Sequence, residues 1–410
     1  MTGEAGTSGA GVVIVGAGHG GVTAAIELRA KGYAGPVTLL SDEPVAPYER
    51  PPLSKAWLTA PDGAPPPLYD ADTLAERGIA LRLGARAEAV DTGARTVTVG
   101  GAMLPYDHLI LATGAAARRL PLPGCDAEGV HTLRTAADAE RLKAALGEGV
   151  RLVVVGAGYI GLEVAASARK RGADVTVAEL SDRPMARTAS VEVAAFFQAA
   201  HEARGVRFVF GDGLAAIETE DARARGVRLA SGRVLPADAV LLAAGGVPDC
   251  ALATAAGLDC DDGIVVDEAA RTSAPGVYAV GDATRRPSAF AHAPIRLESV
   301  HNALEQARLA AADVAGAPPP RVEAPWFWSD QYDLKLQIAG LVGDADRRIV
   351  REGPGALSVF HLRGGALRAV EAVNDPRAYM TGRTALTRGL AVDVGVLADP
   401  EADLKDALAR

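Results

Sequence analysis

Two glycine-rich turns with the same spacing are the residues of this chain that could most clearly do chemistry. One runs Gly16-x-Gly18-x-x-Gly21 and the other runs Gly156-x-Gly158-x-x-Gly161. In such a turn the first glycine permits a tight bend, the second lets a pyrophosphate approach the backbone, and the third lets a helix pack closely on a strand. The pyrophosphate then lies at the positive N-terminus of that helix. Two such turns predict two dinucleotide sites in one chain.

An acidic residue follows each glycine turn at the distance expected for a ribose contact. These residues are Asp42 and Glu179, and a carboxylate there can accept hydrogen bonds from ribose hydroxyls. Glu179 would repel a 2′-phosphate, which favours NADH over NADPH. Arg183 and Arg187 lie just beyond it and weaken this argument, because either could hold the pyrophosphate or tolerate a phosphate.

The elements that must position these turns form an internal repeat. The segments that begin at Gly11 and Val150 each read strand, glycine turn, helix, strand. Their first strands are continuous apolar runs, VVIV and LVVV, typical of strands buried on both faces of a parallel sheet. Each helix ends near a glycine, Gly32 or Gly172. The repeat indicates an α/β protein with two Rossmann-like domains, and the aromatic, strand-forming segment from Trp326 indicates a third domain.

Several polar residues lie where other predicted strands and helices end. One strand ends at Ala112-Thr113-Gly114 and another at Gly281-Asp282, where a carboxylate could accept a hydrogen bond from a ribitol hydroxyl of FAD. A helix predicted from about Ser299 would point the Val300 N–H at whatever lies in front of it, and a helix N-terminus stabilises the anionic edge of a reduced flavin. A solvated strand-end acid and an ordinary capped helix are the structural explanations that stay open.

The stretch YERPPLSK, residues 48–55, places two prolines in front of one lysine, Lys55. Glu163 lies two residues beyond Gly161, in the first turns of the second motif's helix. A carboxylate there is favourable simply because it faces the positive end of the helix dipole. It could also lie near a nicotinamide and pair with Lys55.

Composition limits the classes of protein to consider. A chain of 410 residues suggests two or three domains, and the formal net charge of −9 argues against nucleic acid as the main partner. No cysteine lies in the first 124 residues, so the thiol of a disulfide or peroxide reductase is missing beside the first glycine turn. The N-terminus reads as a flexible leader rather than a signal peptide, and no apolar run reaches the roughly 18 residues that span a bilayer. We expect a cytoplasmic protein without a membrane partner or a metal site.

Four stretches resemble those of the NADH-dependent, FAD-containing ferredoxin reductases of bacterial oxygenase systems: PYERPPLSK, GAGYIGLEVAASA, IRLESVHNALEQAR and PWFWSDQYDLKLQIAG. The resemblance covers nearly the whole chain. It implies a glutathione-reductase-like fold, with an FAD domain split over residues 1–117 and 248–322 and an inserted NAD domain over residues 118–247. A C-terminal α+β domain would cover residues 323–410.

The resemblance also implies a role for individual residues. The residues implied to bind one FAD are Gly16, Gly18, Gly20, Gly21, Asp42, Arg50, Lys55, Ala87, Ala112, Thr113, Gly114, Arg134, Gly281, Asp282, Val300 and Trp328. Those implied to bind NADH are Gly156, Gly158, Ile160, Gly161, Glu163, Glu179 and Gly245. Lys55, Glu163 and Trp328 are implied as catalytic residues, the first two as an ion pair on the nicotinamide side and Trp328 against the flavin.

The implied activity is that of an NADH:ferredoxin oxidoreductase. Hydride would pass from NADH to FAD, and single electrons would pass to a [2Fe–2S] ferredoxin that feeds a cytochrome P450 or a ring-hydroxylating dioxygenase. Candidates for docking the ferredoxin are Arg296, Arg308, Trp326 and Trp328, on a monomer or homodimer. Two other classes stay open: a rubredoxin reductase or NADH oxidase, and a flavoprotein similar to apoptosis-inducing factor.

Overall fold

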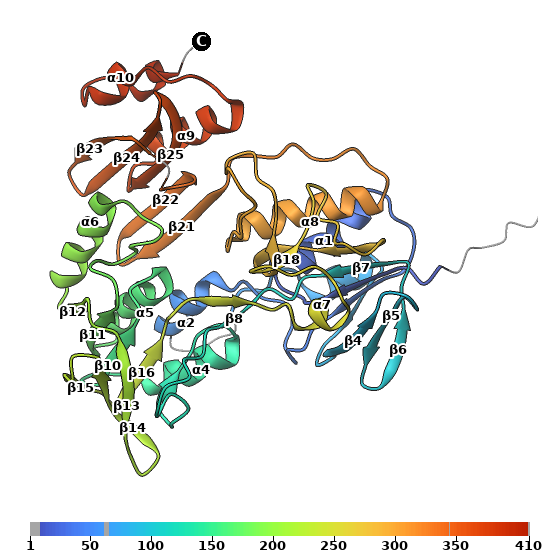
Figure 1. Cartoon of the computed structure of the whole chain (residues 1–410), viewed down its shortest axis with the longest axis horizontal. Coiled ribbons are helices and arrows are strands. Elements are labelled where there is room, and N and C mark those ends of the chain that lie inside the picture. Colours follow the sequence, from blue (N-terminus) through green and yellow to red (C-terminus); the bar gives the residue numbers. More distant parts are fainter. Residues whose placement is uncertain (1–8, 61–64, 344, 409–410) are drawn as a thin grey trace, which may run out of the picture. The chain divides into compact units, whose positions relative to one another are not determined.

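A computed structural model describes residues 9–60, 65–343 and 345–408; residues 1–8, where a flexible leader is expected, lie outside it. The chain divides into two compact units, which Figure 1 shows in colours that follow the sequence. The first unit comprises Met1–Glu49, Pro66–Ala116 and Val247–Val322, and the second comprises Arg50–Pro65, Ala117–Gly246 and Glu323–Arg410. Two short strands lie at chain positions where one unit gives way to the other, β8 (Ala115–Ala117) and β17 (Gly246–Pro248).

The first unit is built on a five-stranded parallel sheet with the order β19-β7-β1-β2-β3. Helices α1 and α8 pack on one face, and an antiparallel sheet of β4, β5 and β6 with helix α7 covers the other. Because both faces are covered, the central strand β1 is buried along its whole length. The elements of this unit are β1 (Val12–Val15), α1 (His19–Ala30), β2 (Val37–Leu40), α3 (Ala71–Glu76), β3 (Ile79–Arg82), β4 (Ala87–Asp91), β5 (Thr96–Val99), β6 (Ala102–Pro105), β7 (His108–Leu111), α7 (Ala251–Ala255), β18 (Ile264–Val265), β19 (Val277–Ala279), η2 (Gly281–Ala283), β20 (Thr284–Arg285) and α8 (Val300–Val314).

The second unit contains a similar parallel sheet, with the order β12-β11-β10-β16-β9, and its own antiparallel sheet of β13, β14 and β15. The elements up to the end of this part are η1 (Pro51–Ser54), α2 (Ala56–Thr59), β9 (Val130–His131), α4 (Ala136–Ala145), β10 (Arg151–Val155), α5 (Tyr159–Lys170), β11 (Asp174–Glu179), α6 (Val191–Glu202), β12 (Arg207–Phe210), β13 (Leu214–Glu220), β14 (Arg223–Leu229), β15 (Val234–Pro236) and β16 (Ala239–Leu242).

The predicted internal repeat is confirmed down to single hydrogen bonds. The Gly16 N–H donates to the Leu40 carbonyl at 2.9 Å, and the Gly156 N–H donates to the Ala178 carbonyl at 2.8 Å. In each unit this bond ties the glycine turn to the end of the neighbouring strand. The glycine turns therefore lie at equivalent places on two separately folded sheets, which confirms the α/β fold with two Rossmann-like domains.

The C-terminal part of the second unit is a five-stranded antiparallel sheet with the order β21-β22-β25-β24-β23. Helix α9 packs on β25 and β22, as the predicted third, α+β domain requires. The elements are β21 (Trp326–Gln331), β22 (Leu334–Gly340), β23 (Arg347–Gly353), β24 (Ala356–Arg363), β25 (Ala366–Val373), α9 (Pro376–Arg388), α10 (Val394–Ala398) and η3 (Leu404–Ala407).

Replacing Gly382 with alanine should destabilise this C-terminal part. A Cβ at Gly382 would lie 2.4 Å from Val370 Cγ1, so helix α9 would have to move away from the sheet. We expect a loss of about 1–3 kcal/mol in unfolding free energy, the usual cost of overpacking a core. Thermal unfolding of G382A measures it, with T384A on the same helix as the control; equal midpoints for the two variants would contradict the expectation.

Candidate dinucleotide and charge-pair sites

The first glycine turn is packed so closely that only glycine fits. A Cβ on Gly16, whose φ is +104°, would lie 2.3 Å from the Ala112 carbonyl oxygen. A Cβ on Gly21 would lie 1.8 Å from the Gly16 carbonyl oxygen. Real Cβ atoms do not approach this closely, so helix α1 rests directly on the turn, as close helix–strand packing in a dinucleotide motif requires.

The second glycine turn repeats this packing and leaves space at its middle position. A Cβ on Gly156 would lie 2.4 Å from the Ala243 carbonyl oxygen, and one on Gly161 would lie 2.1 Å from the Gly156 carbonyl oxygen. At Gly158, in contrast, no heavy atom lies within 4 Å of a Cβ position. Open space beside the middle glycine is what a phosphate approaching the backbone needs.

The helices that follow the two turns differ from the other long helices in how they begin. Among described helices of ten or more residues, α1 and α5 start at Gly18 and Gly158 with no side-chain cap. The helices capped by a side chain are α4, α6, α8 and α9, through Thr135, Ser190, Ser299 and Asp375. Neither Gly18 nor Gly158 has a side chain that could cap its helix, and a pyrophosphate at this end would accept from the first N–H groups. The residues present fit two dinucleotides, one in each unit.

The two acidic residues predicted to bind ribose differ in position. Strand register pairs Val15 with Leu40 in one unit and Val155 with Ala178 in the other. The residue equivalent to Glu179 is therefore Ser41, and Asp42 is the exposed residue after it. A ribose contact by Asp42 stays a prediction.

Glu179 is held in place by backbone N–H groups. Its carboxylate accepts hydrogen bonds from Ala157 N at 2.7 Å and from Ser181 N at 2.8 Å. The first of these bonds ties it to the glycine turn itself. Its position beside the turn agrees with the predicted ribose contact, and its free lone pairs could accept from ribose hydroxyls.

The predicted FAD residues of the first unit gather at the carboxyl ends of neighbouring strands. Val280 N donates to the Leu111 carbonyl at 2.9 Å, which sets the turn at Gly281 beside the segment that begins at Ala112. Gln306 Oε1 on α8 accepts from Gly281 N at 2.8 Å, so α8 holds this turn. The structure thus brings together the segments that carry Ala112, Thr113, Gly114, Gly281, Asp282 and Val300. Helix α8 begins at Val300 as predicted, capped by Ser299.

The stretch YERPPLSK forms a short, stiff connector that packs on helix α5. Residues Pro51–Ser54 form one turn of 3₁₀ helix, for which proline supplies the fixed φ angle. Ser54 binds α5 twice: its hydroxyl donates to Glu163 Oε2 at 2.5 Å, and its carbonyl accepts from the Ser167 hydroxyl at 2.8 Å. This docking places Lys55 directly against the helix.

Lys55 and Glu163 form the predicted ion pair. Lys55 Nζ lies 2.9 Å from Glu163 Oε2, and the two side chains are 19% and 5% exposed. Lys55 Nζ also donates to the Pro51 carbonyl at 3.2 Å. A pair this sheltered keeps its geometry better than a solvated surface pair does, so the ammonium charge is fixed in direction.

The other predicted residues occupy varied surroundings. Arg50 Nη1 donates to the Arg134 carbonyl at 2.9 Å, which joins two of them within the second unit. Ile160 is 45% exposed at the start of α5, and the Gly245 carbonyl accepts from Arg118 N at 3.0 Å. Ala87 is buried in the core of the first unit, so only its backbone could meet a ligand.

Trp328 lies on β21 with its ring 5.5 Å from that of Trp326. The two side chains share one face of the strand, because alternate residues point the same way. Phe327 and Ser329 contact helix α5 from the other face: the Phe327 ring lies 4.5 Å from that of Tyr159, and the Ser329 hydroxyl donates to Glu163. The two tryptophans named as docking candidates therefore lie side by side.

Four buried polar residues linked to Glu163 were not predicted from the sequence. Ser54 and Ser329 bind its carboxylate, and Gln331 and His201 follow in line from Ser329. A signal for two of them was available: Ser329 and Gln331 alternate along β21, so they share the face opposite the tryptophans. His201 continues the buried positions of α6 at Val193 and Phe197, but that spacing gives no hint of a polar partner.

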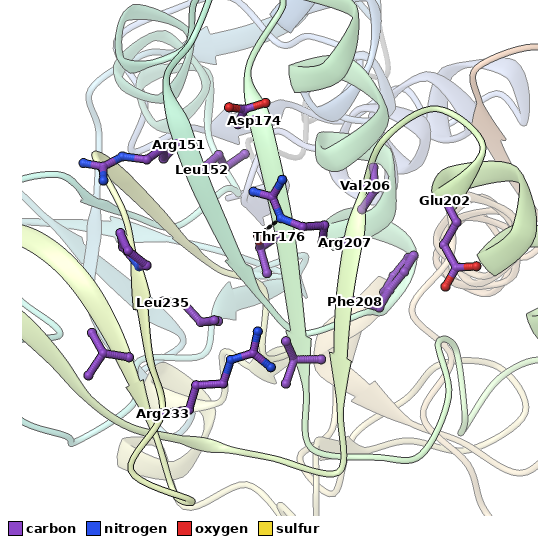
Figure 2. Close-up of a pocket in the computed structure, with 13 residues that line it drawn as sticks. Arg151, Leu152, Asp174, Thr176, Glu202, Val206, Arg207, Phe208, Arg233 and Leu235 are labelled. Carbon is purple, nitrogen blue, oxygen red and sulfur yellow. Dashed lines mark hydrogen bonds between the residues drawn. The ribbon is translucent and has the colours of Figure 1, made fainter.

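The hollow shown in Figure 2 belongs to neither glycine turn. Its volume is about 610 Å³, and Arg151, Asp174 and Arg207 line it. These are the first residues of β10, β11 and β12, whereas the glycine turn follows the last residue of β10. The hollow therefore lies at the amino end of the sheet, opposite the dinucleotide site of an α/β fold.

Metal-binding clusters of His, Cys, Asp or Glu do not occur among the described residues. Cys125, Cys250 and Cys260 are free thiols, and burial raises the pKa of the Cys125 thiol and, more strongly, that of Cys250, to about 11. These two thiols stay protonated near neutral pH and are poor nucleophiles. No helix in the described ranges is both long and apolar enough to cross a membrane.

Comparison with known proteins defines the class to which this chain belongs. The family described as "Pyridine nucleotide-disulphide oxidoreductase" matches residues 10–307, and that described as "Reductase C-terminal" matches residues 326–408. The chain therefore belongs to the pyridine nucleotide-disulphide oxidoreductase family, as an oxidoreductase that uses FAD and NAD(P)H.

Individual relatives narrow this to the ferredoxin reductases. The chain is 45% identical over 403 residues to rhodocoxin reductase of Rhodococcus erythropolis, covering 97% of this chain and 94% of that protein. It is 43% identical over 408 residues to the 5,5'-dehydrodivanillate O-demethylase ferredoxin reductase subunit of a Sphingobium species, covering 97% and 98%. The solved covalent complex of putidaredoxin reductase with putidaredoxin aligns with a TM-score of 0.94 at 40% identity, over 97% of each chain. The resemblance noted from the sequence is confirmed.

The buried His201 should make stability depend on pH. Burial lowers the pKa of His201 to about 4, from 6.5. The unfolded chain therefore takes up a proton at a pH where the folded chain does not, so this contribution to stability is complete above pH 6.5 and is lost as pH falls towards 4. Between pH 7.5 and pH 5 the loss is about 2 kcal/mol for this group alone.

Thermal unfolding of the protein and of H201Q at these two pH values tests the expectation. The midpoint of H201Q should fall less on acidification, because glutamine does not titrate. Equal shifts for both proteins would show that His201 is not held neutral.

Proposed function

We propose that this chain oxidises NADH and delivers the electrons one at a time to a [2Fe–2S] ferredoxin that serves a cytochrome P450 or a ring-hydroxylating dioxygenase. The observation that carries the proposal is the ion pair between Lys55 and Glu163, a residue on the helix that follows the second glycine turn. The chain has no cysteine before residue 125, so a thiol near the first glycine turn is not available as the electron acceptor. Relatives named for ferredoxins support the choice of acceptor. The overall reaction, NADH + 2 oxidised ferredoxin → NAD⁺ + H⁺ + 2 reduced ferredoxin, is balanced.

The two glycine turns bind different dinucleotides in this proposal. FAD, when bound, accepts two electrons as hydride and can give them up singly. Gly16, Gly18, Gly20 and Gly21 hold its pyrophosphate against α1, while Gly156, Gly158 and Gly161 hold that of NADH against α5. Ile160 and Gly245 border the NADH site, and the remaining residues assigned above to FAD keep those assignments as proposals.

Lys55 supplies a fixed positive charge where negative charge develops during hydride transfer. Its ammonium is held by a carboxylate and a backbone carbonyl. A charge that is already oriented needs no reorganisation as the reaction proceeds, which is the main source of electrostatic catalysis. Glu163 fixes the ammonium, and its helix presents it beside the NADH turn.

NADH rather than NADPH is the proposed electron donor. The Glu179 carboxylate lies against the glycine turn, where it would repel a 2′-phosphate. Arg183, which could have offset this charge, donates from Nη1 and Nη2 to the carbonyls of Ala189 and Ala186 at 3.2 and 2.9 Å. Its guanidinium is thus engaged by its own loop.

Replacing Glu179 with glutamine should weaken the preference for NADH. Loss of the repulsion should lower the ratio of kcat/KM for NADH to that for NADPH by about tenfold, which is about 1.4 kcal/mol of discrimination. R183A is the matched control and should leave this ratio within about twofold. A ratio that is unchanged in E179Q, or that changes more in R183A, would contradict the assignment.

We propose two separate features of the chain as contacts for the ferredoxin. In the second unit, Trp326 and Trp328 form an aromatic pair on one face of β21. In the first unit, Arg308 is 47% exposed and only loosely paired with Glu27 at 3.3 Å. Arg296 is less suitable, because it is 16% exposed and already paired with Glu298 and Asp262.

The arrangement of domains proposed for this function keeps the boundaries implied by the resemblance, with the FAD domain split around the NAD domain. The protein is proposed to work in the cytoplasm as a monomer or a homodimer. Neither a membrane nor a nucleic acid has a part in the proposed reaction.

Anaerobic stopped-flow mixing with NADH and then with [2Fe–2S] ferredoxins tests this function. Flavin absorbance should bleach in the first step, and the ferredoxin should be reduced in the second. K55M should retain FAD but slow the first step by about 10²-fold, because one preorganised charge is missing. The second step, measured on protein reduced beforehand with dithionite, should be nearly unchanged.

Other outcomes would assign the chain differently. Rapid bleaching without reduction of any ferredoxin would overturn the proposal in favour of an oxidase or a signalling flavoprotein. Transfer to rubredoxin alone would favour a rubredoxin reductase. An unchanged first step in K55M would show that the lysine charge is not needed.

A further inference from the structure

The Glu163 carboxylate has two oxygens, and they face different partners. Oε2 accepts from Lys55 Nζ at 2.9 Å and from the Ser54 hydroxyl at 2.5 Å. Oε1 faces strand β21 and accepts from the Ser329 hydroxyl at 2.6 Å. Ser329 is fully buried, so water does not compete for this bond.

A chain of buried hydrogen bonds continues from Ser329 away from the ion pair. Gln331 Nε2 donates to the Ser329 hydroxyl oxygen at 3.1 Å, and Gln331 Oε1 lies 2.8 Å from His201 Nε2. The Tyr332 hydroxyl lies 3.3 Å from His201 Nδ1. Ser329, Gln331 and His201 are all buried, so each of these groups depends on its neighbours in the chain for a partner.

Only one arrangement of hydrogens satisfies this chain. A carboxylate can only accept, so the Ser329 hydroxyl must donate to Glu163 and is left to accept from the amide of Gln331. Gln331 then presents its oxygen to His201, whose Nε2 must carry the hydrogen. A neutral imidazole has one donor and one acceptor, so His201 Nδ1 accepts from Tyr332. Every donor therefore points towards Glu163.

Burial keeps His201 in the form that can both donate to Gln331 and accept from Tyr332. Its pKa is lowered mainly by burial, so the ring is neutral at physiological pH, and the bond to Gln331 Oε1 selects the Nε2–H tautomer. A chain of aligned donors strengthens the bond at its end by polarisation. The bond at this end is the one to Glu163 Oε1.

The same region contains other bonds that join its strands and helices. Glu371, on β25, accepts from Ser190 N at the start of α6 at 3.0 Å. Arg204 Nη2 pairs with Asp333 Oδ1 at 2.5 Å. Neither bond leads to Glu163, whereas the chain from His201 ends on it.

We infer that Ser329, Gln331 and His201 are positioning residues that orient the Glu163 carboxylate, and through it the Lys55 ammonium, for hydride transfer. With Oε1 held by Ser329, the carboxylate cannot rotate, and Oε2 stays directed at Lys55. The inference rests on the proposed function, in which Lys55 and Glu163 act at the NADH site. It adds three residues whose effect on the reaction passes entirely through that pair.

Removing the Ser329 hydroxyl tests the inference on the reaction. S329A should retain FAD and bind NADH with a similar dissociation constant, but should reduce the flavin about tenfold more slowly at saturating NADH, because the charge is less well placed. S329T restores a hydroxyl and should recover most of the rate. The matched control is S358A, which removes another fully buried hydroxyl, bound at 2.6 Å to Asp375, in the same sheet but away from Glu163.

A second measurement reports on this chain of hydrogen bonds without any catalytic turnover. Nitrogen-15 NMR of the FAD-loaded protein, labelled at histidine, should show His201 as the neutral Nε2–H tautomer from pH 6 to pH 8, assigned by its absence in H201Q. In Q331L the acceptor for that hydrogen is lost, and the tautomer should shift towards a mixture. A protonated ring or the Nδ1–H tautomer in the unchanged protein would overturn the inference.

The outcomes separate this inference from the function on which it rests. If K55M reduces its flavin at the normal rate, the proposed role of Lys55 fails, whatever the tautomer of His201. If K55M is slow but S329A and Q331L behave like S358A, the proposed function stands and the positioning role is overturned. Slow flavin reduction in S329A and Q331L, with rescue by S329T, supports the inference.

Discussion

Both dinucleotide sites depend on a contact between backbone and backbone that has no room for a methyl group. A Cβ on Gly21 would lie 1.8 Å from the carbonyl oxygen of Gly16, and the same contact recurs between Gly161 and Gly156 at 2.1 Å. Because each helix rests directly on its turn, its first N–H groups are fixed at the carboxyl edge of the sheet. A larger residue would lift the helix and move those groups away from any phosphate. The capping pattern agrees, since the N-cap residues of α1 and α5 are glycines, which have no side chain to cap the helix.

A second constraint arises because Glu163 carries its carboxylate at a nearly buried position, 5% exposed. A buried charge without partners costs several kcal/mol, so its donors must come from whatever segments can reach it. They come from the proline-stiffened connector, through Ser54 and Lys55, and from β21, through Ser329. One carboxylate thus brings together three parts of the second unit. The prolines of YERPPLSK have a matching purpose, since a flexible connector would lose more entropy on being held there.

The parts of the structure that the sequence could predict are those governed by local chemistry. Glycine spacing and apolar runs predict both strand–turn–helix–strand units because each depends on neighbouring residues. The Asp42 position illustrates the limit, since strand register makes Ser41 the equivalent of Glu179, and register is set by the sheet rather than by spacing. The bond from Ser329 to Glu163 spans 166 positions in the chain. Nothing in the residues near either end indicates it, because buried polar side chains find their partners only when the chain is folded.

Strand β21 links these constraints, because its two faces serve different purposes. Ser329 and Gln331 face the helices. Gln331 donates to Ser329, and Ser329 donates to the Glu163 carboxylate that holds Lys55. Trp326 and Trp328 point the other way, and they are the proposed docking residues. A strand cannot shift on one face without moving the other, since its side chains alternate on a single backbone. The bond between Ser329 and Glu163 therefore also restrains the strand that carries the tryptophans, and in the proposed function hydride entry and electron exit would share this one support within the second unit.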